Sequence, residues 1–274
     1  MNWKAPTHAL STSQPVRHLY SVLSKVPIIG PAVRQFLHLV LPTGTRVWTR
    51  ISAGTGKGLW TRLDPRFEMD YVSGVYEGAV ERILSLHLRP GSVFYDVGAH
   101  IGVLSLVAAR LVGARGAVFA FEADPANVVR AEEHVRRNGF EQIHVLSCAV
   151  WSSGGRLRFE RASAKSSLNQ GAVATEQAKI SADMIDVEAI TLDDFSHSHA
   201  PPDLIKIDVE GAEAAVLRGS EQIFKAKSPL LICEVHHEEA LREVSQWLVD
   251  RNYSLQWLGD SPNLPRHLFA RRHE

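Results

Sequence analysis

The sequence has few cysteines, no long hydrophobic run and no excess of charge of either sign. Its two cysteines, Cys148 and Cys233, lie in apolar stretches, which favours buried free thiols and gives no sign of a disulfide framework. No uncharged apolar run reaches roughly 18 residues, so the sequence predicts no membrane-spanning helix. The first residues lack the apolar core of a signal peptide, and we therefore expect a cytoplasmic protein.

The charges balance. Lysine and arginine together number 30, aspartate and glutamate also number 30, and the formal net charge at pH 7 is zero. A chain with no net charge has no overall electrostatic attraction to nucleic acid, although a local basic patch could still exist on its surface. We therefore expect no nucleic-acid partner. The length of 274 residues fits one α/β domain with an appendage, or two small domains.

Residues 1–69 are predicted to form an N-terminal helical arm and a β-hairpin. Apolar residues recur at helical spacing over residues 16–41, and prolines divide this pattern into two pieces. Two interpretations remain open: a membrane-surface helix or, as we favour, an arm that packs on the main domain or on a second copy of the chain. A homo-oligomer formed through these helices is therefore a hypothesis.

The segment Thr45–Leu63 predicts the hairpin. Its turn, residues 53–58, contains a Gly-Lys pair that suggests a phosphate-binding loop. However, Gly58 stands where such a loop has serine or threonine, and no helical pattern follows. A glycine-rich hairpin turn is the better interpretation.

The most informative stretch is VFYDVGAHIG, residues 93–102. It predicts a buried strand, a tight glycine turn and a helix, a junction that aims backbone N–H groups at one point. Gly98 and Gly102 lack a Cβ atom, so a ligand or a neighbouring turn can approach the main chain. Asp96 ends this strand and Glu122 ends the next apolar run, close to the spacing at which a carboxylate meets ribose hydroxyls.

The glycine pattern differs from the fingerprint of dinucleotide-binding proteins, because His100 stands at the second glycine position. This disfavours a diphosphate ligand and an NAD-dependent oxidoreductase. The order D-x-G-x-x-x-G followed by an acidic strand end is similar to the S-adenosylmethionine (SAM) site of Rossmann-like methyltransferases. The alternative is a glycine turn that only packs a helix on a strand.

The segment DLIKIDVEG, residues 203–211, repeats the order of strand, acidic residue, glycine and helix. An apolar strand, LLICEV, then ends at His236. Ligands of open α/β sheets bind beyond the carboxyl ends of the strands, so we expect Asp96, Glu122, Asp208 and His236 to line one crevice. The polar stretch 161–183 predicts a surface flap near it.

Strands alternate with helices and a strand pair ends the chain, which predicts an α/β domain over residues 70–274. We expect a mostly parallel, doubly wound sheet with an antiparallel C-terminal edge strand. Two further strands are predicted over residues 143–150 and 187–192, the second followed by Asp193-Asp194 and the linker SHSHAPP. A helix is also predicted before the glycine turn, with Glu77 near its start. Glu77 either contacts the amino group of the ligand or stabilises the helix by its charge at the positive end of the helix dipole.

Both motifs together resemble the FkbM family of SAM-dependent methyltransferases. The resemblance covers about residues 70–260, and its matching pieces are GVYE, FYDVGAHIG, FEADP, CAVWSSGG, TLDDF, LIKIDVEGAEAAVLRG and ICEVHH. It implies a Rossmann-like class I methyltransferase fold, SAM as cofactor, and O-methylation of a small-molecule or carbohydrate hydroxyl.

The resemblance also implies roles for individual residues. Glu122 would accept hydrogen bonds from the ribose hydroxyls, and Asp208 would lie near the transferred methyl group. The residues implied to hold the rest of SAM are Asp96, Gly98, Ala99, His100 and Gly102 around the methionine and ribose, and Ala123, Ala149 and Val150 around the adenine.

An alcohol acceptor is a poor nucleophile until a base takes its proton. The candidates are Asp208 and His236, which we prefer, with Lys206, Glu210 and His237 behind them. Asp208 could instead orient the SAM amine, His236 could only pack at a strand end, and Lys206 could form a structural ion pair with Asp208. No metal site is predicted, although acidic residues and His236 leave a metal role open.

Two other function classes stay open. One is a non-catalytic SAM-binding partner protein that uses the N-terminal arm as its interface. The other is a nucleic-acid methyltransferase, which is disfavoured because no aromatic-proline tetrapeptide of the base-flipping kind follows the strand that ends at Asp208.

Overall fold

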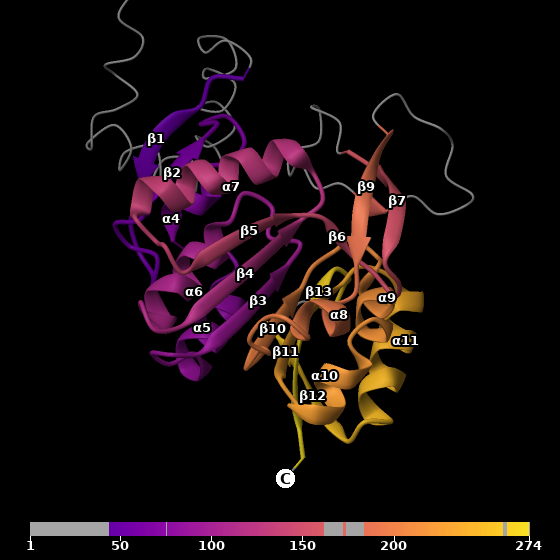
Figure 1. Ribbon diagram of the computed structural model, residues 1–274. Coiled ribbons are helices and arrows are strands. Elements are labelled where there is room, and N and C mark those ends of the chain that lie inside the picture. The colour runs from indigo at the N-terminus through magenta and orange to yellow at the C-terminus, as the bar shows by residue number, and fades with distance from the viewer. Residues whose placement is uncertain (1–43, 75, 162–171, 174–183, 260–261, 274) are drawn as a thin grey trace, which may run out of the picture. The chain divides into compact units, whose positions relative to one another are not determined.

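The computed structural model describes residues 44–74, 76–161, 172–173, 184–259 and 262–273 (Figure 1). The predicted arm over residues 16–41, the proposed contact between copies through it, and most of the predicted flap lie outside the described residues. The chain divides into two compact units, Met1–Gly78 and Ala79–Glu274.

The first unit contains the predicted hairpin. Strands β1 (Val47–Arg50) and β2 (Trp60–Leu63) pair antiparallel. A short helix, α4 (Asp70–Ser73), follows and ends at Gly74 in the left-handed conformation. The hairpin prediction is confirmed, and the glycine-rich segment is its connecting turn.

The second unit is built on a seven-stranded sheet with the order β12-β13-β11-β10-β3-β4-β5. All pairings among β11, β10, β3, β4 and β5 are parallel, whereas β13 runs antiparallel to both of its neighbours. The strands span Val93–Val97 (β3), Ala117–Glu122 (β4), Ile143–Ser147 (β5), Leu204–Ile207 (β10), Leu230–Val235 (β11), Tyr253–Leu258 (β12) and Arg266–Arg272 (β13).

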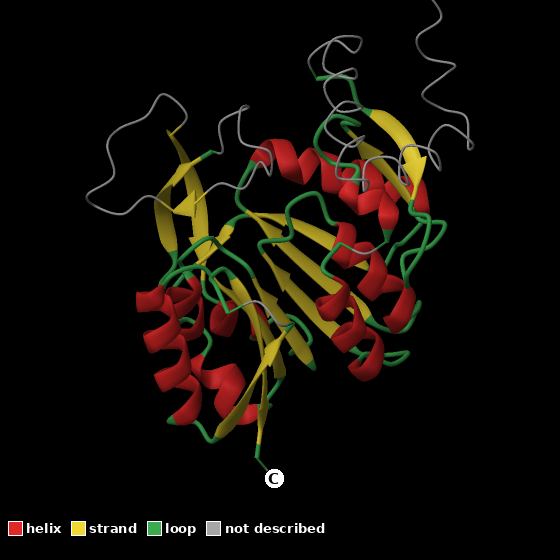
Figure 2. Ribbon diagram, turned by 180° about the vertical axis from the view of Figure 1, so that it is seen from behind, coloured by secondary structure: helices red, strands yellow, loops and turns green. Residues whose placement is uncertain are grey.

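The central strands are buried on both faces, which explains their nearly continuous apolar sequences. Helices α8–α11 supply residues to the hydrophobic core on one face, and α6 contacts β3 and β4. Figure 2 shows helices on both sides of the sheet. The helices of this unit span Gly78–His87 (α5), Val103–Val112 (α6), Pro125–Asn138 (α7), Leu192–Ser196 (α8), Glu213–Arg218 (α9), Glu221–Ala226 (α10) and Glu238–Val249 (α11).

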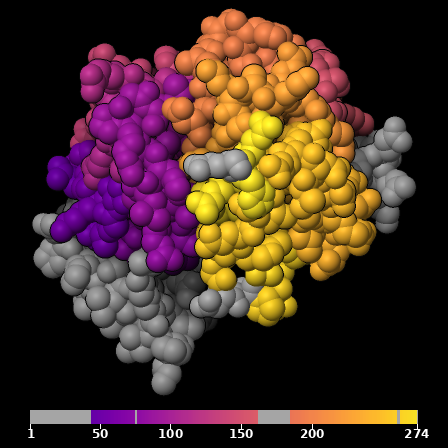
Figure 3. All heavy atoms as spheres, turned by 90° about the horizontal axis from the view of Figure 1, so that it is seen from below, coloured from indigo at the N-terminus to yellow at the C-terminus, as the bar shows by residue number. Residues whose placement is uncertain are grey.

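The predicted fold class is confirmed, with one refinement at the sheet edge. The C-terminal strand β13 is antiparallel, as expected, but it lies between β11 and β12. The outermost strand is therefore β12. Figure 3 shows the yellow C-terminal segment at the surface beside the orange and gold region that precedes it.

The prediction of one strand over residues 143–150 was wrong. The chain leaves the main sheet after β5, where the N–H of Cys148 bonds to the carbonyl of Leu146. Residues Ala149–Val150 then form β6, which pairs with β9 in a second sheet of order β6-β9-β7-β8. The other strands of this sheet are Gly155–Glu160 (β7), Ala172–Val173 (β8) and Met184–Ile190 (β9).

The predicted linker begins later than expected, because Asp193-Asp194 and the residues beside them form helix α8. Thr191 caps it, since the hydroxyl accepts a hydrogen bond from the Asp194 N–H at 2.9 Å. Helix α10 was not predicted either. No helix among the described residues has the length and apolar character required to cross a membrane.

Candidate active site

A pocket lies where strands β3, β4 and β10 end. It brings together several residues that the sequence assigned to SAM binding, although they come from segments far apart in the chain. The pocket is lined by Val97, Gly98, His100, Phe121, Glu122, Ala123, Asn127, Cys148, Ala149, Val150, Phe159, Asp208, Val209, Glu210 and Ala212.

The turn after β3 is shaped by backbone that glycine tolerates best. Gly98, His100 and Gly102 all have positive φ angles, of +77°, +51° and +77°. A Cβ atom on Gly98 would lie 1.8 Å from the carbonyl oxygen of Asp208, at the end of the neighbouring strand. Gly98 is therefore required for the two motifs to meet at the pocket.

Gly102 faces away from this junction. It is not among the residues that line the pocket, and a Cβ atom there would lie 3.2 Å from the Cβ of Ala131 in α7. Its absent side chain allows α6 and α7 to pack closely. Its predicted contact with SAM stays a prediction.

We expect Gly102→Ala to lower the free energy of unfolding by about 1–2 kcal/mol, because alanine disfavours the left-handed region and Ala131 must shift. Urea denaturation of the purified protein measures this. Gly154→Ala is the control, since its Cβ would meet only the Ala189 carbonyl oxygen at 3.7 Å. Equal stability of the two variants would contradict the packing role.

Glu122 is held rigidly at the pocket. Its Oε2 accepts a hydrogen bond from the His100 N–H at 2.7 Å, and its Oε1 accepts one from the Asp124 N–H at 2.9 Å. Burial raises the pKa of Glu122 to about 7, although these backbone donors favour the charged form. The carboxylate retains further lone pairs for ligand hydroxyls.

Small and apolar side chains form the part of the pocket next to Glu122. Ala123 follows Glu122 directly, and Ala149 and Val150 come from β6. Phe159 of β7 adds an aromatic face that the sequence analysis missed. Small side chains beside an aromatic ring leave a slot that suits a flat ring such as adenine.

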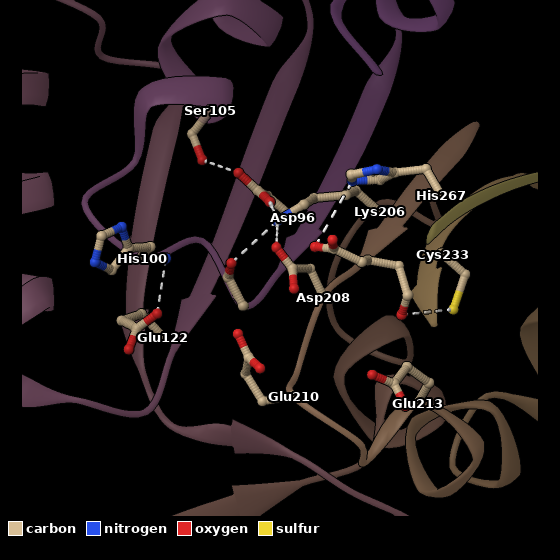
Figure 4. Close-up of polar contacts among 12 residues, drawn as sticks. Asp96, His100, Ser105, Glu122, Lys206, Asp208, Glu210, Glu213, Cys233 and His267 are labelled. Carbon is tan, nitrogen blue, oxygen red and sulfur yellow. Dashed lines mark hydrogen bonds and ion pairs between the residues drawn. The ribbon is translucent and has the colours of Figure 1, made fainter. Parts of the chain in front are cut away.

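Asp96 lies beneath the pocket and does not line it. It is fully buried, accepts a hydrogen bond from the Ser105 hydroxyl at 2.5 Å, and lies 3.6 Å from the Lys206 ammonium. Lys206 also donates to Asp208 Oδ2 at 3.0 Å and to the Gly98 carbonyl at 3.2 Å. Figure 4 shows Asp96, Lys206 and Asp208 together. Lys206 and Asp208 therefore form the ion pair that was the alternative to a catalytic role for Lys206, and the catalytic role stays a prediction.

His236 is surrounded by carboxylates. Its Nδ1 lies 2.6 Å from Glu213 Oε1, and its Nε2 lies 3.3 Å from Glu210, 3.6 Å from Asp208 and 3.9 Å from Glu234. Burial opposes the imidazolium charge, but hydrogen bonds with Glu210 and Glu213 outweigh it and raise the pKa of His236 to about 10.

Asp208 belongs to this carboxylate cluster and also lines the pocket. Burial alone would raise its pKa, but the charges of Lys206 and His236 outweigh burial and lower it below the usual value. Asp208 is therefore ionised at neutral pH. His236 approaches Asp208 without lining the pocket, so the structure brings the two preferred base candidates together.

Glu213 is the member of this cluster that the sequence analysis missed. It is fully buried in the first turn of α9, and the same Oε1 that contacts His236 accepts a hydrogen bond from the Gly211 N–H at 2.8 Å. The sequence shows it as the second glutamate of the segment VEGAE, residues 209–213, but that pattern indicates only the start of a helix and gives no role at the site. Glu77 belongs to the first unit, and its role at the site stays a prediction.

The sheet order and the pocket at its carboxyl edge define the Rossmann-like fold of class I methyltransferases. Residues 96–255 match the family described as the methyltransferase FkbM domain, and the chain belongs to this family. A methyltransferase FkbM from Methylobacillus flagellatus KT has a similar fold, with a TM-score of 0.51 and 18% sequence identity. The match covers 73% of this chain and 46% of that longer one.

Curated relatives are methyltransferases of different kinds. The hexuronic acid methyltransferase AglP of Haloferax volcanii is 26% identical over 209 residues, which is 76% of this chain and 78% of AglP. A ribosomal protein L11 methyltransferase of Lactococcus lactis is 38% identical over 101 residues, which is 36% of this chain and 31% of that protein. The AglP match extends over most of both proteins, whereas the L11 match is local.

Proposed function

We propose that this protein transfers a methyl group from SAM to a hydroxyl oxygen of a carbohydrate or another small molecule. The observation that carries the proposal is the pocket itself. It places a buried carboxylate, Glu122, beside a slot of small side chains, and it places the ionised Asp208 at the edge of the same space.

The residues of the pocket fit SAM. Glu122 is positioned to accept hydrogen bonds from ribose hydroxyls, and Ala123, Ala149 and Val150 suit the adenine ring. Gly98 and His100 of the turn after β3 also line the pocket, and the methionine part of SAM would bind beside them. Bound SAM supplies a methyl group on a sulfonium, which is already a good leaving group.

The chain's own contribution to catalysis is orientation and proton removal. The acceptor hydroxyl must lose its proton as its oxygen attacks the methyl carbon. Asp208 is our candidate for the base, since Asp208 Oδ1 has no hydrogen-bond partner among the described residues and Asp208 lines the pocket. We set His236 aside as the base, because its raised pKa of about 10 keeps the imidazole protonated at neutral pH. Lys206 holds the other oxygen of Asp208, which orients the carboxylate.

A sugar is the favoured acceptor for two reasons, and the choice of its hydroxyl rests on the family resemblance alone. The family resemblance implies O-methylation, and the relative AglP acts on a hexuronic acid by its name. The cluster of Asp208, Glu210 and Glu234 beside the pocket also offers several acceptors for hydroxyl donors.

Calorimetry with S-adenosylhomocysteine, with NAD⁺ as a control ligand, tests the cofactor assignment. We expect micromolar affinity for S-adenosylhomocysteine and no binding of NAD⁺. Binding of NAD⁺ alone, or of neither compound, would refute the proposed SAM site.

The acceptor is found by incubating the protein with methyl-labelled SAM and a set of hexuronic acids and neutral sugars. We expect an alkali-stable methyl ether on one sugar class, identified by mass spectrometry. SAM binding without transfer to any hydroxyl would instead support the alternative of a non-catalytic SAM-binding partner. Transfer to RNA or DNA would support a nucleic-acid methyltransferase.

A further inference from the structure

We propose that Asp208, Glu234 and His236 form a binding site for one divalent cation of the Mn²⁺ or Mg²⁺ type. The site lies at the ends of β10 and β11, next to the pocket. Only its use in methyl transfer rests on the function proposed above. Cation binding itself does not depend on that function.

The candidate donor atoms lie close to one another. One ligand atom from each of Asp208, Glu234 and His236 lies within 4.8 Å of the others. His236 Nε2 is 3.6 Å from Asp208 Oδ1 and 3.9 Å from Glu234 Oε2. Two ligands at about 2.1 Å from a shared ion can be at most about 4.2 Å apart, so both separations are compatible with a common metal.

Asp208 has an oxygen available for such an ion. The residue is 8% exposed, and Lys206 binds only its Oδ2. The other oxygen, Oδ1, is buried and has no hydrogen-bond partner among the described residues, and it faces His236 Nε2. A buried carboxylate oxygen that accepts no hydrogen bond destabilises the folded state unless an ion or a ligand binds to it.

A carboxylate contacts the ring nitrogen of His236 that lies away from the proposed ion, as is usual for histidines that bind metals. Glu213, which is fully buried, contacts Nδ1 at 2.6 Å, so the ring orientation is set and Nε2 points toward the three other carboxylates. A carboxylate on the far nitrogen of a ligand histidine fixes its tautomer and strengthens it as a donor.

The local charge also favours a cation. Four carboxylates lie within 3.9 Å of the one imidazole, and Lys206 is already shared between Asp208 and Asp96. A divalent ion balances this charge better than a single imidazolium does. Two carboxylates and one imidazole suit Mn²⁺, and the carboxylate majority also admits Mg²⁺. A cation here would acidify an acceptor hydroxyl bound to it, and Asp208 would then act as a ligand of the cation instead of as the base.

Electron paramagnetic resonance with Mn²⁺ as the probe tests the site on the full chain. We expect saturable binding of one Mn²⁺ per chain and nitrogen modulation of the Mn²⁺ signal from the imidazole. Glu234→Gln should weaken the binding at least tenfold. The matched control is Glu239→Gln, which removes one exposed carboxylate from the start of α11 and should leave Mn²⁺ binding unchanged.

Three results would overturn the proposal: no saturable Mn²⁺ binding at millimolar concentration, binding without nitrogen modulation, or equal affinity in both variants. The spectrum of the unsubstituted protein decides the first two even if Glu234→Gln does not fold. Calorimetry with S-adenosylhomocysteine on the same sample separates the two proposals. Intact S-adenosylhomocysteine binding without Mn²⁺ binding overturns the cation site alone.

Discussion

Asp208→Asn is expected to reduce methyl transfer about a thousandfold while S-adenosylhomocysteine binding stays within a fewfold of the original. Asparagine keeps the shape of the side chain, but its amide cannot take a proton and is a poor ligand for a cation. General-base catalysis contributes roughly 10²–10⁴ in rate, so a thousandfold loss corresponds to about 4 kcal/mol of transition-state stabilisation. Single-turnover transfer from methyl-labelled SAM to the identified sugar measures this.

The control for this variant is Asp250→Asn, the same chemical change at the exposed end of α11. It should transfer methyl groups at the original rate. Full activity of Asp208→Asn would remove Asp208 from catalysis and leave it as the buried partner of Lys206. Loss of S-adenosylhomocysteine binding together with turnover would instead assign Asp208 to cofactor binding.

Glu122→Ala is expected to weaken S-adenosylhomocysteine binding roughly 10- to 100-fold, because ribose hydroxyls would lose a charged acceptor worth about 1.5–3 kcal/mol. Glu122→Gln should give a smaller loss, since its amide oxygen still accepts a hydrogen bond. Calorimetry at pH 8 measures both, with Glu132→Gln on the exposed face of α7 as the control. Unchanged affinity in Glu122→Ala would exclude Glu122 from the site.

The pH dependence of binding gives a second test of Glu122. Its pKa is raised to about 7 by burial, so the carboxyl gains a proton as the pH falls through that value. The protonated form accepts ribose hydroxyls less well, and we therefore expect the affinity to fall below about pH 7 and to level off above it. Glu122→Gln should lose this pH dependence.

The motifs were predictable from the sequence because they are local. The turn after β3 depends on Gly98 and Gly102, whose positive φ angles few other residues tolerate. Helix α7 begins at Pro125, where Asp124 Oδ1 accepts a hydrogen bond from the Ala126 N–H, and it ends at Gly139 in the left-handed conformation. These signals act within a few residues of one another.

Helix α10 could not be predicted from the residues near it in the sequence. Its own N-cap residue, Ser220, makes no side-chain cap hydrogen bond. The cap comes instead from Asp193 of α8, whose carboxylate accepts from the N–H groups of Gln222 and Ile223 at 3.0 Å each. Because the capping residue lies about thirty positions earlier in the chain, no pattern around residues 221–226 could reveal it.

The sequence by itself determined the strand–glycine–helix motifs and the residues at the strand ends, because backbone sterics and apolar periodicity act locally. Only the tertiary structure decided which of those residues meet. It placed Asp96 beneath the pocket, moved Ala149 and Val150 into a second sheet, and joined Glu213 to His236. These contacts depend on strand order and helix packing, and both depend on the folding of the whole domain.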